Sequence, residues 1–220
     1  MPKNNSLIKA SAGSRRSTQK EKTRMLILDS ARNLFNKSGF DKTSTRAIAK
    51  DAGVGIGTVF SHFPNKQSLL IAALLDDLSS TLKKATETLS DDVTVCDKLI
   101  HIAGYFYSYY AKKPDLSRTY LKEMWFVKGE WGGELFAQAH QFLSLLNKIF
   151  EEAIQTNEIR PEADTMLCAR AFFSHYLNVL FEGLSEKEFD QGKMTDVLQS
   201  LVNQLVEGIG PHKNTQGANT

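Results

Sequence analysis

The residues best suited to chemistry lie in the stretch DAGVGIGTVFSHFPNK, which runs from Asp51 to Lys66 and has glycines at positions 53, 55 and 57. Glycine clusters of this kind cradle phosphate in nucleotide-binding enzymes, or they let a chain turn sharply between two helices. A dinucleotide-binding loop needs G-x-G-x-x-G after a strand, but here Thr58 occupies the third glycine position and the preceding AIAKDA has a helical pattern. A Walker loop needs a following Gly-Lys-Ser or Gly-Lys-Thr, which this stretch lacks. The glycines therefore favour a turn between helices.

The surrounding sequence supplies those helices. Apolar residues recur at three and four positions through TRMLILDSARNLFNKSGF, which predicts a first helix that stops at Gly39. A second short helix follows over TRAIAKDA, with Ser44 or Thr45 as its N-cap. A third short helix, GTVFSHF, ends before Pro64, and a fourth begins at Lys66 and runs to about position 88.

Two short helices joined by a glycine-containing turn form a helix-turn-helix, whose second helix enters the DNA major groove. The helical period places six residues toward a core shared with the first helix: Ile48, Ala49, Ala52, Val54, Val59 and Phe63. The outward positions of the third helix carry mostly short side chains that suit close approach to base edges. They are Ile56, Gly57, Thr58, Phe60, Ser61 and His62.

This segment, over residues 23–70, resembles the N-terminal DNA-binding domain of the TetR family of transcriptional repressors. The resemblance rests on residues with ordered spacing along the four helices. These are Ala31, Leu34, Phe35, Gly39, Thr43, Ile48, Ala49, Ala52, Gly53, Val54, Gly57, Thr58, Phe63, Lys66 and Leu69. Two positions depart from the family pattern, because Gly55 stands where a serine commonly caps the recognition helix and Phe60 stands where a tyrosine is common.

Positions within this motif predict the contacts with DNA. The start of the second helix, with Thr43, Ser44 and Thr45, is expected to hold a phosphate, as is Lys66 at the start of the fourth. Base contacts are expected from the third helix. Arg46, in the second helix, is expected to reach a base or a phosphate. The complete predicted DNA-binding set is Thr43, Ser44, Thr45, Arg46, Gly55, Ile56, Gly57, Thr58, Phe60, Ser61, His62 and Lys66.

The distribution of charge supports a polyanionic partner at one end of the chain. The first 70 residues carry 13 Lys and Arg against 4 Asp and Glu, although the net charge of all 220 residues is only +2.

We expect a flexible basic arm over 1–20, a DNA-binding domain over 21–67, a helical domain over 68–210 and a flexible tail over 211–220. No apolar run reaches the roughly 18 to 20 residues that span a bilayer, and no secretory signal is evident, so a cytoplasmic protein is expected.

The remainder of the chain predicts an all-α fold of about nine helices, with further helices over about 91–112, 114–127, 134–157, 161–184 and 188–209. The resemblance implies that this part binds a ligand and forms a homodimer. The helix over 188–209 has a wide apolar stripe, and the one before it is apolar nearly all round. Pairing these last two helices with their copies predicts a four-helix interface and a near-palindromic operator.

Aromatic and histidine side chains concentrate in the middle of the chain and suit an apolar pocket with a few polar anchors. The predicted ligand-binding residues are Phe106, Tyr109, Tyr110, Trp125, Trp131, Phe136, His140, Phe172, His175 and Tyr176. Each is also explicable as plain helical core. No catalytic motif, metal-ligand spacing or cofactor fingerprint accompanies them.

The sequence thus predicts a dimeric regulator, most simply a repressor, that binds double-stranded DNA and is released by a small, mainly apolar effector. Three alternatives remain open at this stage. They are a DNA-binding protein without sequence preference, a regulator controlled by a protein partner, and a helical enzyme.

Overall fold

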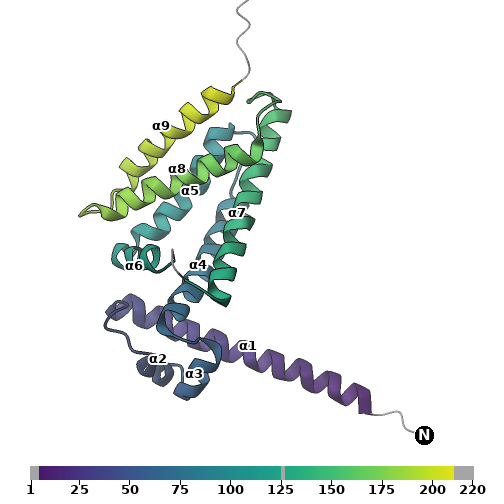
Figure 1. The fold of residues 1–220 in the computed structure, drawn as a ribbon, viewed down its shortest axis with the longest axis vertical. Coiled ribbons are helices and arrows are strands. Elements are labelled where there is room, and N and C mark those ends of the chain that lie inside the picture. The colour runs from purple at the N-terminus through teal and green to yellow at the C-terminus, as the bar shows by residue number, and fades with distance from the viewer. Residues whose placement is uncertain (1–4, 125–126, 211–220) are drawn as a thin grey trace, which may run out of the picture. The chain divides into compact units, whose positions relative to one another are not determined.

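A computed structural model of the chain describes residues 5–124 and 127–210, with side chains described from residue 17 onwards. Throughout this described part the chain is α-helical apart from connecting turns, which confirms the all-α prediction. The helices found there are α1 (Asn5–Ser38), α2 (Thr45–Asp51), α3 (Ile56–His62), α4 (Lys66–Glu87), α5 (Val95–Ala111), α6 (Pro114–Met124), α7 (Glu130–Gln155), α8 (Thr165–Ser185) and α9 (Gln191–Ile209) (Figure 1).

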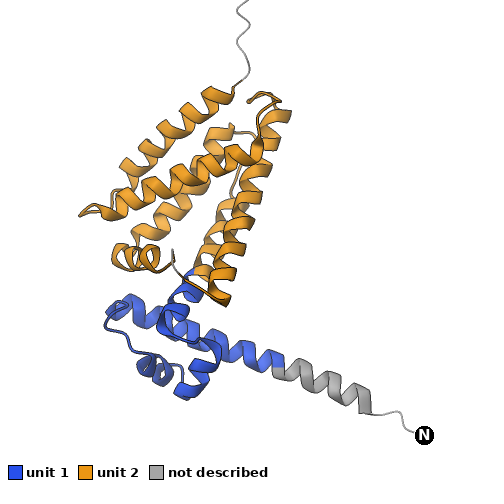
Figure 2. Ribbon diagram, viewed as in Figure 1, with its two compact units in different colours: residues 1–74 blue, residues 75–220 orange. Residues whose placement is uncertain are grey.

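The chain divides into two compact units, residues 1–74 and residues 75–220 (Figure 2). The division falls inside α4, so this single helix contributes residues to both units. The boundary predicted from the sequence, between residues 67 and 68, lies earlier in the same helix. The predicted tail at 211–220 lies outside the described residues.

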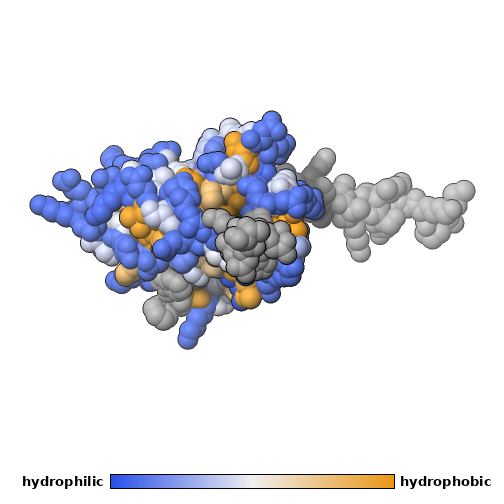
Figure 3. Space-filling model, turned by 90° about the horizontal axis from the view of Figure 1, so that it is seen from above, coloured by the Kyte–Doolittle hydropathy of each residue, from blue (hydrophilic) through white to orange (hydrophobic). Residues whose placement is uncertain are grey.

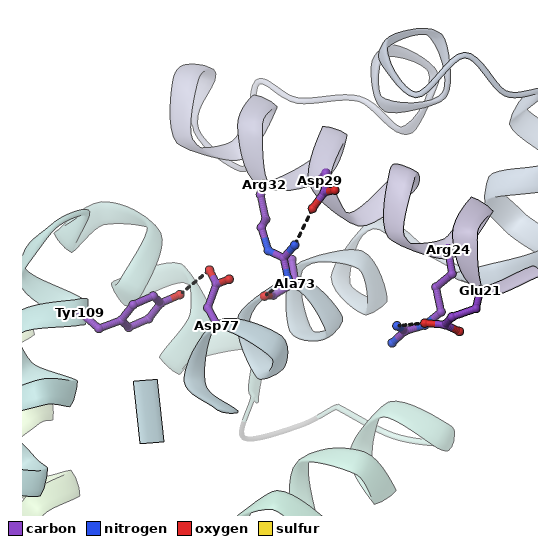
Figure 4. Close-up of polar contacts among 7 residues, drawn as sticks. All are labelled: Glu21, Arg24, Asp29, Arg32, Ala73, Asp77 and Tyr109. Carbon is purple, nitrogen blue, oxygen red and sulfur yellow. Dashed lines mark hydrogen bonds and ion pairs between the residues drawn. The ribbon is translucent and has the colours of Figure 1, made fainter. Parts of the chain in front are cut away.

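Unit 1 has a small core to which all four of its helices contribute. The side chains buried there include Ile27 and Phe35 of α1, Ile48 of α2, Val59 of α3 and Leu70 of α4. The side chain of Arg32 fixes α1 against the first part of α4, because Nη2 donates to the carbonyl oxygen of Ala73 at 3.4 Å while Nη1 pairs with Asp29 at 2.8 Å (Figure 4). Of the residues predicted to face inward, Ile48, Ala49, Val59 and Phe63 are buried, whereas Ala52 and Val54 are only partly buried.

Several helix starts differ from the sequence prediction: α5 begins at Val95 rather than near 91, α8 at Thr165 rather than 161 and α9 at Gln191 rather than 188, and α1 and α7 both begin earlier than predicted. Helix α1 begins at Asn5, within the segment 1–20 that the sequence predicts as a flexible arm. Apart from Gly13, this segment has no helix-breaking residue after Pro2, and its lysine, arginine and glutamine residues favour a helix. Helix α7 begins at Glu130 rather than near 134, because Gly129 takes a positive φ of 71° and serves as its N-cap.

Unit 2 is a bundle in which α8 packs between α7 and α9, and α5 packs against both α7 and α9. Helix starts are set by side-chain caps, including a capping box between Thr94 and Asp97 before α5 and single aspartates, Asp164 and Asp190, before α8 and α9. The Tyr109 hydroxyl donates to Asp77 Oδ2 at 3.2 Å and ties α5 to α4 (Figure 4). These contacts give a close-packed helical scaffold for the cavity described below.

Hydrophilic residues cover most of the described surface on the face drawn in Figure 3, with hydrophobic residues in separate patches between them. None of the described helices combines the length and the apolar character that crossing a bilayer would require.

Candidate DNA interface and ligand cavity

Helix α3 presents a face of short side chains that is open to solvent. Val59 is buried and holds the helix to the core, whereas Ile56 and Phe60 are exposed, Phe60 by 48%. Gly57 and Ser61 are also exposed, and no atom would lie within 4 Å of a Cβ at Gly57. The outward position expected for Phe60 is therefore confirmed. Because most side chains on this face are short, another molecule can approach the helix backbone closely.

The turn between α2 and α3 depends on two glycines with different roles. Gly53 has a φ of 67°, a left-handed conformation that a side chain disfavours, and its amide donates to the Lys50 carbonyl at 3.2 Å to end α2. Gly55 is the N-cap of α3 and offers no side-chain acceptor, whereas Ser44 caps α2 by accepting from the Ala47 amide at 3.1 Å. The glycine cluster thus forms the connection of a helix-turn-helix.

Two predicted phosphate ligands are engaged inside unit 1. Thr43 is buried, and its hydroxyl lies 2.7 Å from the carbonyl oxygen of Gly39 and 3.2 Å from that of Leu34. Lys66 Nζ donates to the Phe40 carbonyl at 2.9 Å and lies 4.2 Å from the centre of the Phe40 ring. The phosphate contact expected of the Thr43 side chain does not fit this placement, because its proton is already donated to backbone. The ammonium group of Lys66 has a structural role here whether or not it also meets a phosphate.

The remaining predicted polar residues of the interface are accessible. Ser44, Arg46 and Ser61 are exposed, while Thr45, Thr58 and His62 are partly exposed. Partial burial, followed by the positive charges of Lys20 and Arg24, lowers the pKa of the His62 imidazole below its usual 6.5. The ring is therefore mostly uncharged at neutral pH and can both donate and accept hydrogen bonds.

Unit 2 contains a cavity of about 80 Å³ between α4, α5, α6, α7 and α8. Leucine and phenylalanine side chains form most of its wall, and among its described lining residues none carries a charge. The polar groups are the hydroxyls of Tyr110, Tyr120 and Tyr176 and the amide of Gln138. An apolar chamber with a few polar groups is the usual composition of a small-molecule site.

The predicted ligand residues divide into two groups. Phe106, Tyr110 and Tyr176 line this cavity, and their roles stay predictions. Trp131 and Phe172 are buried elsewhere in the core, Tyr109 is bonded to Asp77, His140 is exposed, and Phe136 is 67% exposed. His175 is partly exposed and does not line the cavity, and Trp125 lies outside the described residues.

Several lining residues are absent from the predicted set. They come from four helices that are distant in sequence: Leu78 and Leu82 of α4, Tyr120 of α6, Gln138 of α7 and Phe173 of α8. Helical periodicity predicts that some of these residues face inward and makes no prediction for the others. It cannot distinguish a residue that lines a cavity from one in the close-packed core. The one sequence signal that could have indicated a lining residue is the enrichment of aromatic residues around Tyr120.

Comparison with known proteins agrees with this geometry. Residues 27–73 match the family described as "Bacterial regulatory proteins, tetR family". The HTH-type transcriptional regulator UidR of Escherichia coli (strain K12) is 35% identical over 191 residues, which are 86% of this chain and 95% of UidR. The fatty acid metabolism regulator protein of Bacillus subtilis (strain 168) is 26% identical over 192 residues, which are 87% of this chain and 97% of that protein.

A solved structure supports the fold over nearly the whole chain. FadR of Thermus thermophilus, a TetR family transcriptional repressor crystallised with lauroyl-CoA, superposes with a TM-score of 0.72 at 19% identity, covering 89% of this chain and 100% of that one. This likeness extends the agreement beyond the helix-turn-helix into the helical unit that contains the cavity. The chain therefore belongs to the TetR family of transcriptional regulators, with its helix-turn-helix in the matched residues 27–73.

Proposed function

We propose that the protein is a homodimeric repressor that binds a near-palindromic operator through α2 and α3 and leaves it when a small, mainly apolar effector enters the cavity of unit 2. The observation that carries this proposal is the combination of an open, short-chained α3 face in one unit with an uncharged apolar cavity in the other. A DNA-binding protein without regulation has no need of such a cavity.

The proposed dimer forms through α8 and α9. Large apolar side chains remain exposed on these two helices, among them Leu167 and Phe181 of α8, by 62% and 60%, and Val197 of α9. Exposed apolar side chains on neighbouring helices are expected where a second copy of the chain covers them. Two recognition helices would then meet successive major grooves about 34 to 36 Å apart, which requires an operator with approximate two-fold symmetry.

The effector is proposed to carry a hydrocarbon portion. The cavity wall is apolar, and FadR of Thermus thermophilus and FadR of Bacillus subtilis have been crystallised with lauroyl-CoA and stearoyl-CoA respectively. At about 80 Å³ the cavity is smaller than the roughly 300 to 1,000 Å³ of sites that enclose drug-sized ligands. A ligand of that size must therefore widen the cavity, and it would favour the conformation in which the cavity is wide.

Helix α4 is the proposed link between the ligand and the DNA. Leu78 and Leu82 of α4 line the cavity, while the first turns of the same helix supply Leu69 and Leu70 to the core of unit 1. A displacement of Leu78 and Leu82 is carried along one continuous helix. Operator release follows if the widened state holds the recognition helices at a spacing that no longer suits two grooves.

Genome-wide selection of binding sites with the purified protein tests the proposal. The expected result is a set of fragments that share one near-palindromic sequence. Random fragments, with an affinity that falls with salt and ignores sequence, would instead support DNA binding without sequence preference. Selection repeated with decanoyl-CoA and octanoyl-CoA present should recover fewer fragments, and unchanged recovery would argue against acyl-CoA effectors.

A further inference from the structure

One polar group in the cavity has no hydrogen-bond partner. Tyr120 of α6 is only 1% exposed, and its hydroxyl oxygen is buried without a donor or an acceptor in reach. A hydroxyl that is buried and unpaired is unfavourable, because it has lost its hydrogen bonds to water without replacement. Whatever occupies the cavity must either supply a partner for this hydroxyl or leave it unpaired.

The other polar groups of the cavity are already engaged. Tyr110 and Tyr176 share a hydrogen bond between their side chains, and the pKa of the Tyr110 phenol is raised to about 12 because burial outweighs that bond. The Gln138 amide nitrogen donates to the Leu75 carbonyl and to Ser79 Oγ, both at 2.8 Å. Among these lining groups, the Tyr120 hydroxyl is therefore the one that is buried without any hydrogen-bond partner, and its proton is available to a ligand.

A charged ligand group does not fit beside Tyr120. Among the described residues that line the cavity there is no lysine, arginine or histidine to compensate a carboxylate or a phosphate. A buried anion without a paired cation loses its hydration, and a hydrogen bond from one phenol cannot compensate for that loss. Burial also raises the pKa of Tyr120 well above its usual value, so the phenol keeps its proton and acts as a donor.

We propose that Tyr120 is a specificity-determining residue, whose hydroxyl donates a hydrogen bond to an uncharged oxygen acceptor, such as a ketone, ester or hydroxyl oxygen, on the buried end of the effector. This inference rests on the proposed ligand-responsive function and names the chemistry of the ligand at that site. A ligand with a plain hydrocarbon end leaves Tyr120 unpaired and binds less tightly than one whose end carries the acceptor. Any charged part of the effector lies outside the cavity.

Three probes of nearly the same shape test the inference on the full-length protein without DNA. Acetophenone carries a ketone oxygen, α-methylstyrene carries a CH₂ group in the same place, and benzoate carries a charge. We expect acetophenone to bind about tenfold more tightly than α-methylstyrene, and benzoate to bind more weakly than either, as measured by ligand-observed NMR titration.

Two variants assign the preference to one hydroxyl. Tyr120→Phe should reduce the ketone preference to within about twofold while α-methylstyrene keeps its affinity. Tyr105→Phe is the matched control, because the Tyr105 hydroxyl bonds to Thr88 and does not line the cavity, and the tenfold preference should persist in it. Tyr120→Phe removes a hydroxyl that has no partner, so the melting temperature of this variant should equal or exceed that of the unchanged protein.

The inference is overturned if wild-type protein binds the ketone and the alkene equally, if the preference survives in Tyr120→Phe, if benzoate binds most tightly, or if no probe binds. Because DNA takes no part in these measurements, any such result leaves operator selection as a separate question. Conversely, recovery of random fragments in the selection experiment would contradict the proposed repressor function, and a ketone preference that depends on Tyr120 could still be observed.

Discussion

His62 is the one imidazole in unit 1 and lies at the end of the recognition helix. Burial and the positive charges of Lys20 and Arg24 lower its pKa in the free protein, whereas a nearby phosphate backbone would raise it. A group whose pKa rises on binding adds affinity that is fully present below its pKa in the free protein. That affinity is lost as pH increases through its pKa in the complex.

We therefore predict that operator affinity increases as pH falls from about 8 to 6, by at most about tenfold per pH unit from this group. His62→Gln should flatten that dependence, measured by fluorescence anisotropy on a fixed operator fragment at constant salt. His140→Gln, which changes an exposed histidine of α7 in unit 2, should keep the original slope. Equal slopes for wild type and His62→Gln would mean that His62 does not approach a phosphate.

At the scale of the elements, Lys66 connects the turn after α1 to the start of α4. Its ammonium donates to the Phe40 carbonyl at 2.9 Å and approaches the Asp41 carbonyl at 3.5 Å, above the Phe40 ring. Hydrogen bonds from a charged donor and a cation–π contact together are expected to stabilise such a partly exposed turn by about 1 to 2 kcal/mol. A role limited to DNA phosphate would give no such stabilisation.

Replacement of Lys66 by methionine keeps the apolar stem and removes the donor. We expect the amides of α1 to α3 to exchange with solvent about 5- to 30-fold faster in Lys66→Met without DNA, as followed by hydrogen–deuterium exchange. Lys50→Met changes an exposed lysine of α2 and serves as the control, with exchange close to that of the unchanged protein. Equal protection in both variants would restrict Lys66 to a role in binding DNA.

The elements also show which features the sequence can predict. The period of apolar residues and the glycines at 39 and 53 predict α2, α3 and their buried face, because residue types near in the chain set where a helix ends and which of its faces is apolar. The engagement of Thr43 and Lys66 depends on where backbone carbonyls of the preceding turn point, which residue types do not reveal. The cavity is harder still, since its wall combines residues of five helices and depends on where packing fails to fill space.

At the scale of the whole molecule, the arrangement of two recognition helices depends on the proposed interface of α8 and α9. A dimer contacts both half-sites at once, so the second contact gains from a high effective concentration. Breaking the interface should therefore lower affinity for the full operator strongly while each half-site keeps its weak affinity. Oligomeric state and DNA affinity are thus expected to change together.

Two exposed phenylalanines give a matched pair for this test. Phe181 of α8 is 60% exposed and Phe136 of α7 is 67% exposed, so glutamate at either position is expected to cost unit 2 little stability by itself. We predict that Phe181→Glu is a monomer by light scattering at micromolar concentration and binds the full operator at least about a hundredfold more weakly, because a dimer would bury the added charges. Phe136→Glu should remain dimeric with unchanged affinity. If Phe181→Glu stays dimeric, α8 does not form the interface at this position, and if Phe136→Glu dissociates, the interface extends over α7 instead.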